Sequence, residues 1–294
     1  MQTPFAITLA PDSGLANKTG TWRTQKPLYV SLMPPCNNAC PAGENTQEWL
    51  YYAEEGKHEE AWRVIARDNP FPAIHGRVCY HPCENAYNRA QVPDGGGPVS
   101  IHAVERFLGD LAIRNGWDVD CAVPTEKRVM VVGSGPCGLA AAYHLARLGH
   151  SVTVFEAGKK LGGMMRYGIP AYRLPRDVLD AEIDRIARMG VEFKVNHKVD
   201  DVVSALKSGA YHAAFLGIGA GAGKHVEIPA RQAGKIIDAV NFLREAADGK
   251  TDIKVGRRVA IYGPVSRHGH RGDREPLGRF GRRARRCSGS ETRA

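Results

Sequence analysis

The sequence predicts an α/β protein in which a small helical domain precedes a larger domain of alternating strands and helices. Three observations predict this class. Apolar residues recur at helical spacing before residue 116, strand and helix patterns alternate after residue 127, and a glycine-rich turn joins the first strand to the first helix. Of the 294 residues, 43% are hydrophobic and 24% charged, which is ordinary for a folded chain of two domains.

The helical domain is predicted over residues 1–122 and begins with an arm that has little periodicity. Asn45, followed three residues later by Glu48, has the pattern of a capping box and predicts a helix start. A second helix is predicted over 58–68, because apolar residues recur there on one face and prolines follow. We expect a loop from the end of this helix to Pro98.

A third helix is predicted from Ser100, as its N-cap, to about Asn115. A unit of short helices and long loops has a modest core, which a bound metal would stabilise. The buried stripe of this third helix is expected to consist of Val104, Phe107, Leu108 and Leu111.

The alternating domain is predicted over residues 123–263, and its last strand, 258–262, resembles the start of a second βαβ unit. After Gly263 the pattern stops, and residues 264–294 are predicted to form a disordered basic tail. The other predicted elements are strands over 128–132, 151–155, 191–195 and 213–218, the last of them buried, and helices over 139–148, 177–189, 202–206 and 239–247.

The glycine-rich turn predicts a Rossmann-type nucleotide site, because it follows an apolar strand and opens an alanine-rich helix. Its first glycine allows the tight turn, its second lets the backbone approach a pyrophosphate, and its third allows close helix packing. Glu156 ends the next strand, where a carboxylate can accept hydrogen bonds from a ribose. The turn consists of Gly133, Ser134, Gly135, Pro136, Cys137 and Gly138.

This fingerprint fits FAD and NAD equally well, so the cofactor has to be inferred from the residues that follow. Gly162 and Gly163 form a pair soon after Glu156, and a glycine pair leaves no side chain between backbone and cofactor. Arg166 and Arg173 place positive charge that suits a diphosphate or a flavin, although both are also typical of solvated surface positions.

The charge and cysteine content limit the class of function. The net charge is +9, but residues 264–294 hold nine arginines against three acidic residues, so the basic character belongs mostly to the tail. We therefore expect no nucleic-acid partner. No stretch approaches the roughly 20 apolar residues that cross a bilayer, and the first ten residues lack a signal-peptide pattern, so we expect no membrane association and a cytoplasmic protein.

Four of the seven cysteines are regularly spaced, as Cys36-x3-Cys40 and Cys79-x3-Cys83. In a reducing compartment such pairs point to metal or redox chemistry rather than to disulfides. Thiolates that converge from two loops suit a soft metal centre, whereas the paired ligands of zinc more often lie two residues apart. Buried cysteines without a ligand remain an alternative.

Together these residues resemble the small (beta) subunit of NADPH-dependent glutamate synthase and the related N-terminal half of dihydropyrimidine dehydrogenase. The resemblance covers about 34–263. It is carried by Cys36-Asn-Asn-Ala-Cys40-Pro41, Asn69-Pro-Phe-Pro, Gly76-Arg-Val-Cys79, Pro82-Cys83-Glu84, the glycine-rich turn, the segment 162–170 and Arg173-Leu174-Pro175.

The resemblance implies that NADPH reduces FAD and that single electrons then pass through 4Fe-4S clusters to a larger partner subunit, such as the glutamate synthase alpha subunit or another iron-sulfur oxidoreductase. It also implies an FAD site formed by residues 133–138, Glu156, Gly163, Met164, Arg173 and Val199.

The chain departs from the family pattern around the cysteines. An additional cysteine pair usual upstream is missing, because residues 22–35 contain no cysteine, and Tyr87 stands where a third downstream cysteine is expected. We therefore expect one cluster. Its ligands are either Cys36, Cys40, Cys79 and Cys83, or the last three with Glu105, which corresponds to a glutamine ligand of dihydropyrimidine dehydrogenase.

The chain also departs from the family at its C-terminus. Residues 257–263 resemble the strand that enters the NADPH-binding glycine loop, but Pro264-Val265-Ser266 replaces the expected glycines. We expect a frameshift or truncated reading frame near Gly263, and hence a truncated second dinucleotide-binding unit. The functional alternatives are a non-catalytic remnant or assembly subunit that binds FAD and a cluster, and a zinc-stabilised interaction module.

Overall fold

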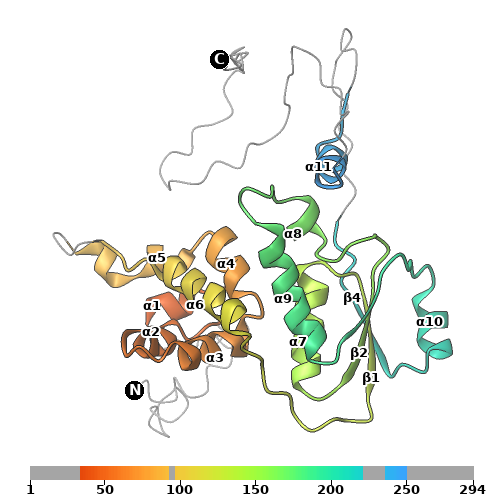
Figure 1. The fold of residues 1–294 in the computed structure, drawn as a ribbon, viewed down its shortest axis with the longest axis horizontal. Coiled ribbons are helices and arrows are strands. Elements are labelled where there is room, and N and C mark those ends of the chain that lie inside the picture. Colours follow the sequence, from red (N-terminus) through yellow and green to blue (C-terminus); the bar gives the residue numbers. More distant parts are fainter. Residues whose placement is uncertain (1–33, 93–96, 221–235, 250–294) are drawn as a thin grey trace, which may run out of the picture.

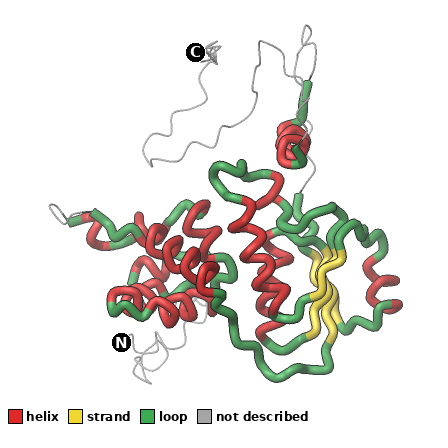
Figure 2. Tube along the Cα trace, in the orientation of Figure 1, coloured by secondary structure: helices red, strands yellow, loops and turns green. Residues whose placement is uncertain are grey.

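In the computed structural model, which describes residues 34–92, 97–220 and 236–249, a group of helices lies beside a parallel β-sheet (Figure 1). Loops and helices dominate the N-terminal part, and the strands gather in the other part (Figure 2). The elements of the N-terminal part are α1 (Pro35–Ala39), α2 (Thr46–Glu54), α3 (His58–Asp68), α4 (Pro72–Val78), α5 (Pro82–Ala86), a 3₁₀ turn (Asn88–Gln91) and α6 (Ile101–Asn115).

Helix α2 begins at the predicted cap, where the side chain of Asn45 accepts a hydrogen bond from the backbone N–H of Glu48. The predicted loop up to Pro98 was wrong, because this segment contains α4, α5 and the 3₁₀ turn. Pro72 and Pro82 each begin a helix, and proline is favoured at that position because its missing N–H would have no helical partner there.

The predicted buried stripe of α6 was also wrong in part. Phe107 is 45% exposed, whereas Glu105 is buried together with Leu108. Ser100 is the N-cap residue, but its side chain makes no capping hydrogen bond. The inward face of α6 therefore includes a carboxylate, which a search for apolar periodicity does not find.

Two glycines explain how α6 is oriented. A Cβ added to Gly76 would lie 2.4 Å from the backbone nitrogen of Arg106, and a Cβ added to Gly109 would lie 2.3 Å from the backbone nitrogen of Ala73. The backbones of α4 and α6 are thus in direct contact, which larger side chains would prevent. This contact places Glu105, one turn before Gly109, toward the end of α4.

The sheet has four parallel strands in the order β3-β2-β1-β4. Helices α7 and α9 cover one face and α10 covers the other, which agrees with the predicted α/β domain of Rossmann type (Figure 1). The elements are β1 (Arg128–Val132), α7 (Pro136–Arg147), β2 (Ser151–Phe155), α8 (Met164–Tyr167), α9 (Arg176–Arg188), β3 (Glu192–Lys194), α10 (Val202–Ser208), β4 (Ala213–Leu216) and α11 (Ala239–Ala247).

The strand predicted over 213–218 is present as β4, but it is shorter than predicted and is not buried. Strand β4 ends at Leu216, which is 56% exposed, and Phe215 is also exposed. Because β4 is the edge of the described sheet, only β1 pairs with it. The apolar side chains of β4 therefore do not show that the strand is buried.

The helical part and the sheet part share one core. Phe71 and Ile74, at the start of α4, are buried in the same apolar cluster as the residues of α7 and α9. The hydroxyl of Tyr143, in α7, donates a hydrogen bond of 2.5 Å to the carbonyl oxygen of Ala66 in α3. These contacts fix the distance between the two parts.

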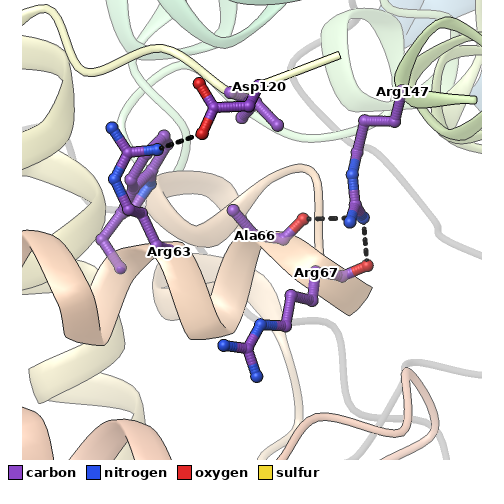
Figure 3. A pocket seen from close by; sticks show the side chains of 7 residues that line it. Arg63, Ala66, Arg67, Asp120 and Arg147 are labelled. Atoms are coloured by element: carbon purple, nitrogen blue, oxygen red, sulfur yellow. Dashed lines mark hydrogen bonds and ion pairs between the residues drawn. The ribbon is translucent and has the colours of Figure 1, made fainter. Parts of the chain in front are cut away.

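A hollow of about 190 Å³ lies at this junction (Figure 3). Arg147 of α7 donates hydrogen bonds to the carbonyl oxygens of Ala66 and Arg67, and Arg63 pairs with Asp120. The last carbonyl groups of a helix lack partners within it, so Arg147 closes the C-terminal end of α3. The hollow is thus part of the joint between the domains.

Several predictions fall on residues that the structure does not describe. They are the N-terminal arm, the strand over 258–262 and the tail over 264–294. None of the described helices combines the length and the apolar composition that a membrane span requires.

Candidate cofactor sites

The glycine-rich turn lies at the C-terminal end of β1, next to the end of β2. The backbone N–H of Gly133 donates to the carbonyl oxygen of Phe155 at 2.8 Å, and Gly133 has a φ of +100°. A Cβ added to Gly138 would lie 1.9 Å from the carbonyl oxygen of Gly133. The first and third glycines are therefore required by the tight contact of strand, turn and helix, as the sequence predicts.

The middle glycine has a different role. A Cβ added to Gly135 would meet nothing within 4 Å, so this position faces open space and its φ of −71° suits any residue. Its other side is covered by Gly163, whose added Cβ would lie 2.7 Å from the Cα of Gly135. The backbone N–H of Gly162 donates to the carbonyl oxygen of Ser134 at 3.0 Å. The glycine pair and the turn thus form one surface, open above Gly135.

Glu156 lies beside this surface, at the end of β2. One of its carboxylate oxygens accepts hydrogen bonds from the backbone N–H and the hydroxyl of Ser134, at 2.9 and 2.5 Å. The other accepts from the backbone N–H of Gly158 at 2.7 Å. Three donors therefore hold an acidic group at the edge where a ribose would lie in a Rossmann-type site.

The structure distributes the other predicted nucleotide residues over a wider area. Met164 begins α8 directly after the glycine pair and is 43% exposed. Val199 packs with Phe155 on the α10 face of the sheet, close to the strand end that carries Glu156. Arg166 is buried, where it pairs with Asp180 and donates to the carbonyl oxygen of Leu161, so it stabilises the loop rather than offering a free charge.

Arg173 lies in the exposed segment between α8 and α9. Burial and the neighbouring His102 lower the pKa of His81, and the positive charge of Arg173 adds to this effect. An interaction of this kind requires proximity. The segment between α8 and α9 therefore lies near the loop from Cys79 to Cys83, and it connects the nucleotide surface to the cysteine region.

Three of the four regularly spaced cysteines share one electrostatic environment. Cys40 follows the last residue of α1, Cys79 follows the last residue of α4, and Cys83 lies in α5. Burial raises the pKa of Cys83 to about 12, and Cys40 and Cys79 contribute to that increase. Cys40 and Cys79 can affect the pKa of Cys83 only if their thiols lie near it, and the packing of α1 against α5 brings Cys40 toward Cys83.

Two buried carboxyl groups border these thiols. Burial raises the pKa of Glu44 to about 7 and, together with Glu44, raises the pKa of Glu105 far above its usual range. The side-chain amide of Asn69 donates to both carboxyl groups, at 2.8 Å each. Burial is the main cause that raises the pKa of Cys79, and the charge of Glu105 adds to it. Glu105 therefore lies beside that thiol.

Cys36 has a different environment. It is 2% exposed and lies in the apolar cluster of the helical domain with Trp49 and Trp62. Its thiol has one described polar contact, a weak one of 3.7 Å with the side-chain oxygen of Asn37. The electrostatic effects above connect members of the second predicted ligand set, in which Glu105 replaces Cys36, and the choice between the two sets stays a prediction.

This donor set fits an iron-sulfur group. Burial raises the pKa of all three thiols, so they stay protonated on their own, whereas a bound cationic centre deprotonates coordinating thiols. One oxygen of Glu105 is held by the side-chain amide of Asn69. Asn69 and Glu44 were missed by reasoning from the cysteines alone. The sequence did contain one signal, the Asn69-Pro-Phe-Pro segment. It identifies Asn69 but not the two carboxyl groups to which Asn69 donates.

Comparisons with known proteins agree with this arrangement of two sites. The family described as "Dihydropyrimidine dehydrogenase domain II, 4Fe-4S cluster" matches residues 29–117. The family described as "NAD(P)-binding Rossmann-like domain" matches residues 131–182. The first match contains the cysteines and Glu105, and the second contains the glycine-rich turn, Glu156 and the glycine pair.

Three curated relatives match most of the chain. The NADPH-dependent glutamate synthase small chain of Mycobacterium tuberculosis is 36% identical over 79% of this chain and 50% of its own length. Subunit beta of the NADP(+)-dependent formate dehydrogenase of Moorella thermoacetica is 32% identical over 82% of this chain and 37% of its own length. The NAD-dependent dihydropyrimidine dehydrogenase subunit PreT of Salmonella typhimurium is 34% identical over 78% of this chain and 55% of its own length. The chain thus spans about half the length of these relatives, or less.

Proposed function

Since this chain is related to the small-subunit family of NADPH-dependent glutamate synthase, we propose that it is an oxidoreductase subunit that passes electrons between NADPH, FAD and one 4Fe-4S cluster to a larger partner subunit. The observation that carries this proposal is that, in addition to burial, Cys40 and Cys79 raise the pKa of Cys83 and Glu105 raises the pKa of Cys79, which supports one shared site. When bound, FAD converts the two-electron transfer of a nicotinamide nucleotide into the single-electron transfers that a cluster accepts.

The residues proposed to bind FAD are those around the glycine-rich turn. The open space above Gly135 lets the backbone approach a diphosphate, and the start of α7 offers N–H groups to its oxygens. The carboxylate of Glu156, already oriented by Ser134, is placed to accept hydrogen bonds from the ribose hydroxyls. The remaining proposed contacts are Pro136, Cys137, Gly162, Gly163, Met164, Arg173 and Val199.

The residues proposed to bind the cluster are Cys40, Cys79, Cys83 and Glu105. Glu105 is buried and the three thiols are half-buried, and Asn69 orients Glu105 through a 2.8 Å hydrogen bond. The segment that carries Arg173 extends from the glycine pair toward the Cys79–Cys83 loop, which supports a short path between the two cofactors. The relatives are named as subunits or chains of larger enzymes, which supports a partner subunit as the next acceptor.

The test is the cofactor content of anaerobically purified and reconstituted full-length protein. We expect about four iron atoms and four sulfides per chain, together with one FAD. We also expect the broad visible absorption of the cluster to bleach with dithionite, and bleaching by NADPH would demonstrate the complete path. A colourless protein that takes up neither iron nor flavin would contradict the proposal.

A further inference from the structure

A second group of metal-binding side chains lies next to the thiols but is separate from them. It consists of His81, just before α5, Glu84 within α5, and His102 in the first turn of α6. Each side chain offers one ligand atom, and the three atoms lie within 4.8 Å of one another. Within the described part of the chain, this is the one group of three or more such residues at this spacing.

His81 has two unfavourable features that a ligand would explain. Its Nε2 atom is buried and has no hydrogen-bond partner in the described structure. Its backbone has a φ of +53°, in the left-handed region that a residue with a Cβ rarely adopts. A buried nitrogen without a partner costs free energy, and so does such a backbone conformation. Both costs fall on one residue of the group.

Glu84 holds His102 in place. One of its carboxylate oxygens accepts a hydrogen bond of 3.0 Å from the backbone N–H of His102 and lies 2.6 Å from the Nδ1 atom of the same residue. The ring of His81 lies 4.2 Å from the ring of His102, between centroids. The three side chains are therefore brought together by the folded chain itself, and His102 is exposed enough for an ion to enter.

We propose that His81, Glu84 and His102 bind one divalent transition-metal ion of the class that prefers imidazole ligands, separate from the iron-sulfur cluster. Ligand atoms about 2.1 Å from one ion lie at most about 4.2 Å apart, so the observed spacing needs little adjustment. Two imidazoles and a carboxylate leave a fourth position for water or a substrate atom. The ligands are nitrogen and oxygen, whereas the cluster site supplies mainly sulfur, so the two sites select different metals.

The test uses Zn²⁺ as the probe on the full-length chain carrying its reconstituted cluster. Wild type, His102→Ala and Glu84→Gln are equilibrated with zinc and a competing chelator, and zinc, iron and sulfide are then measured per chain. His58→Ala is the matched control, because His58 is also an imidazole of the helical domain in contact with α6, through Phe107. The amount of zinc that thiols bind per chain would be the same in all four proteins, so it does not affect the comparison.

We expect wild type and His58→Ala to hold one zinc ion more per chain than His102→Ala, with equal iron and sulfide in all proteins. Glu84→Gln keeps the capping oxygen at α6 but loses the charge, and its affinity for zinc should fall about tenfold or more. Equal zinc in wild type and His102→Ala would overturn the proposal. A loss of iron together with zinc in His102→Ala would also overturn it, since the histidine would then serve the cluster.

Discussion

The carboxylate of Glu182, in α9, accepts a hydrogen bond of 2.9 Å from the backbone N–H of Ala73, in the first turn of α4. Glu182 is fully buried and pairs with Arg185, which donates to the carbonyl oxygen of Pro70 at 2.9 Å. The first N–H groups of a helix lack partners within it and attract negative charge. Because α4 ends just before Cys79, this contact positions the thiols relative to the sheet.

Replacing Glu182 should destabilise the whole chain. In Glu182→Ala, the buried guanidinium of Arg185 loses its ion pair and the N–H of Ala73 loses its acceptor. We expect the free energy of unfolding to fall by about 3–5 kcal/mol. Chemical denaturation followed by circular dichroism measures this change.

The control for that experiment is Asp184→Ala, which removes an exposed carboxylate from the same helix. Surface substitutions of this kind usually change stability by less than about 0.5 kcal/mol. If Glu182→Ala were as stable as Asp184→Ala, the buried pair would not hold α4 in place.

Two glycines of the turn should respond differently to the same substitution. Gly135→Ala adds a methyl group in open space, so we expect an unchanged melting temperature but an affinity for FAD at least about tenfold lower, because the methyl group occupies the approach to the diphosphate. Gly138→Ala places its Cβ 1.9 Å from the carbonyl oxygen of Gly133 and should unfold at lower temperature. Thermal melts and flavin titration distinguish the two effects, and full FAD affinity in Gly135→Ala would argue against this binding site.

Replacement of Cys83 and replacement of Cys36 should have different effects on the iron content. Cys83→Ala removes a proposed ligand, so iron and sulfide should be lost from the reconstituted protein. Cys36→Ala removes a buried thiol from the apolar cluster, so iron should be retained while stability falls by about 1–2 kcal/mol. Cys121→Ala, at an exposed position, is the control for both. Loss of iron in Cys36→Ala alone would instead support the set of four cysteines.

We expect the chain to lose stability in mild acid because folding lowers the pKa of His75. Burial lowers its pKa to about 4, whereas the unfolded chain binds a proton near pH 6.5. Between these values the unfolded state binds more protons, so the free energy of unfolding should fall by about 1–3 kcal/mol as the pH decreases from 6.5 to 4. Denaturation at several pH values should give a shallower decrease for His75→Gln, and an equal decrease in both proteins would assign the effect to other groups.

Local patterns in the sequence were sufficient for most of the elements. The bounds of α3, β1, β2 and α11 agree with the predicted ranges, because helical periodicity and alternating strands act over neighbouring residues. The turn over 133–138 was predicted for the same reason, since the close approach of Gly138 to Gly133 lies within one βαβ unit. Short helices that begin with proline were missed, because proline both ends and begins helices.

The sequence by itself determined the fold class, the nucleotide-binding turn and the presence of cysteines spaced for a metal. Only the tertiary structure decided which cysteines meet. Cys40, Cys79 and Cys83 come from the ends of separate short helices, and the packing of α1 against α5 brings Cys40 toward Cys83. Glu105 joins them because two glycines let α4 and α6 touch, a contact between residues about thirty positions apart that local periodicity does not contain.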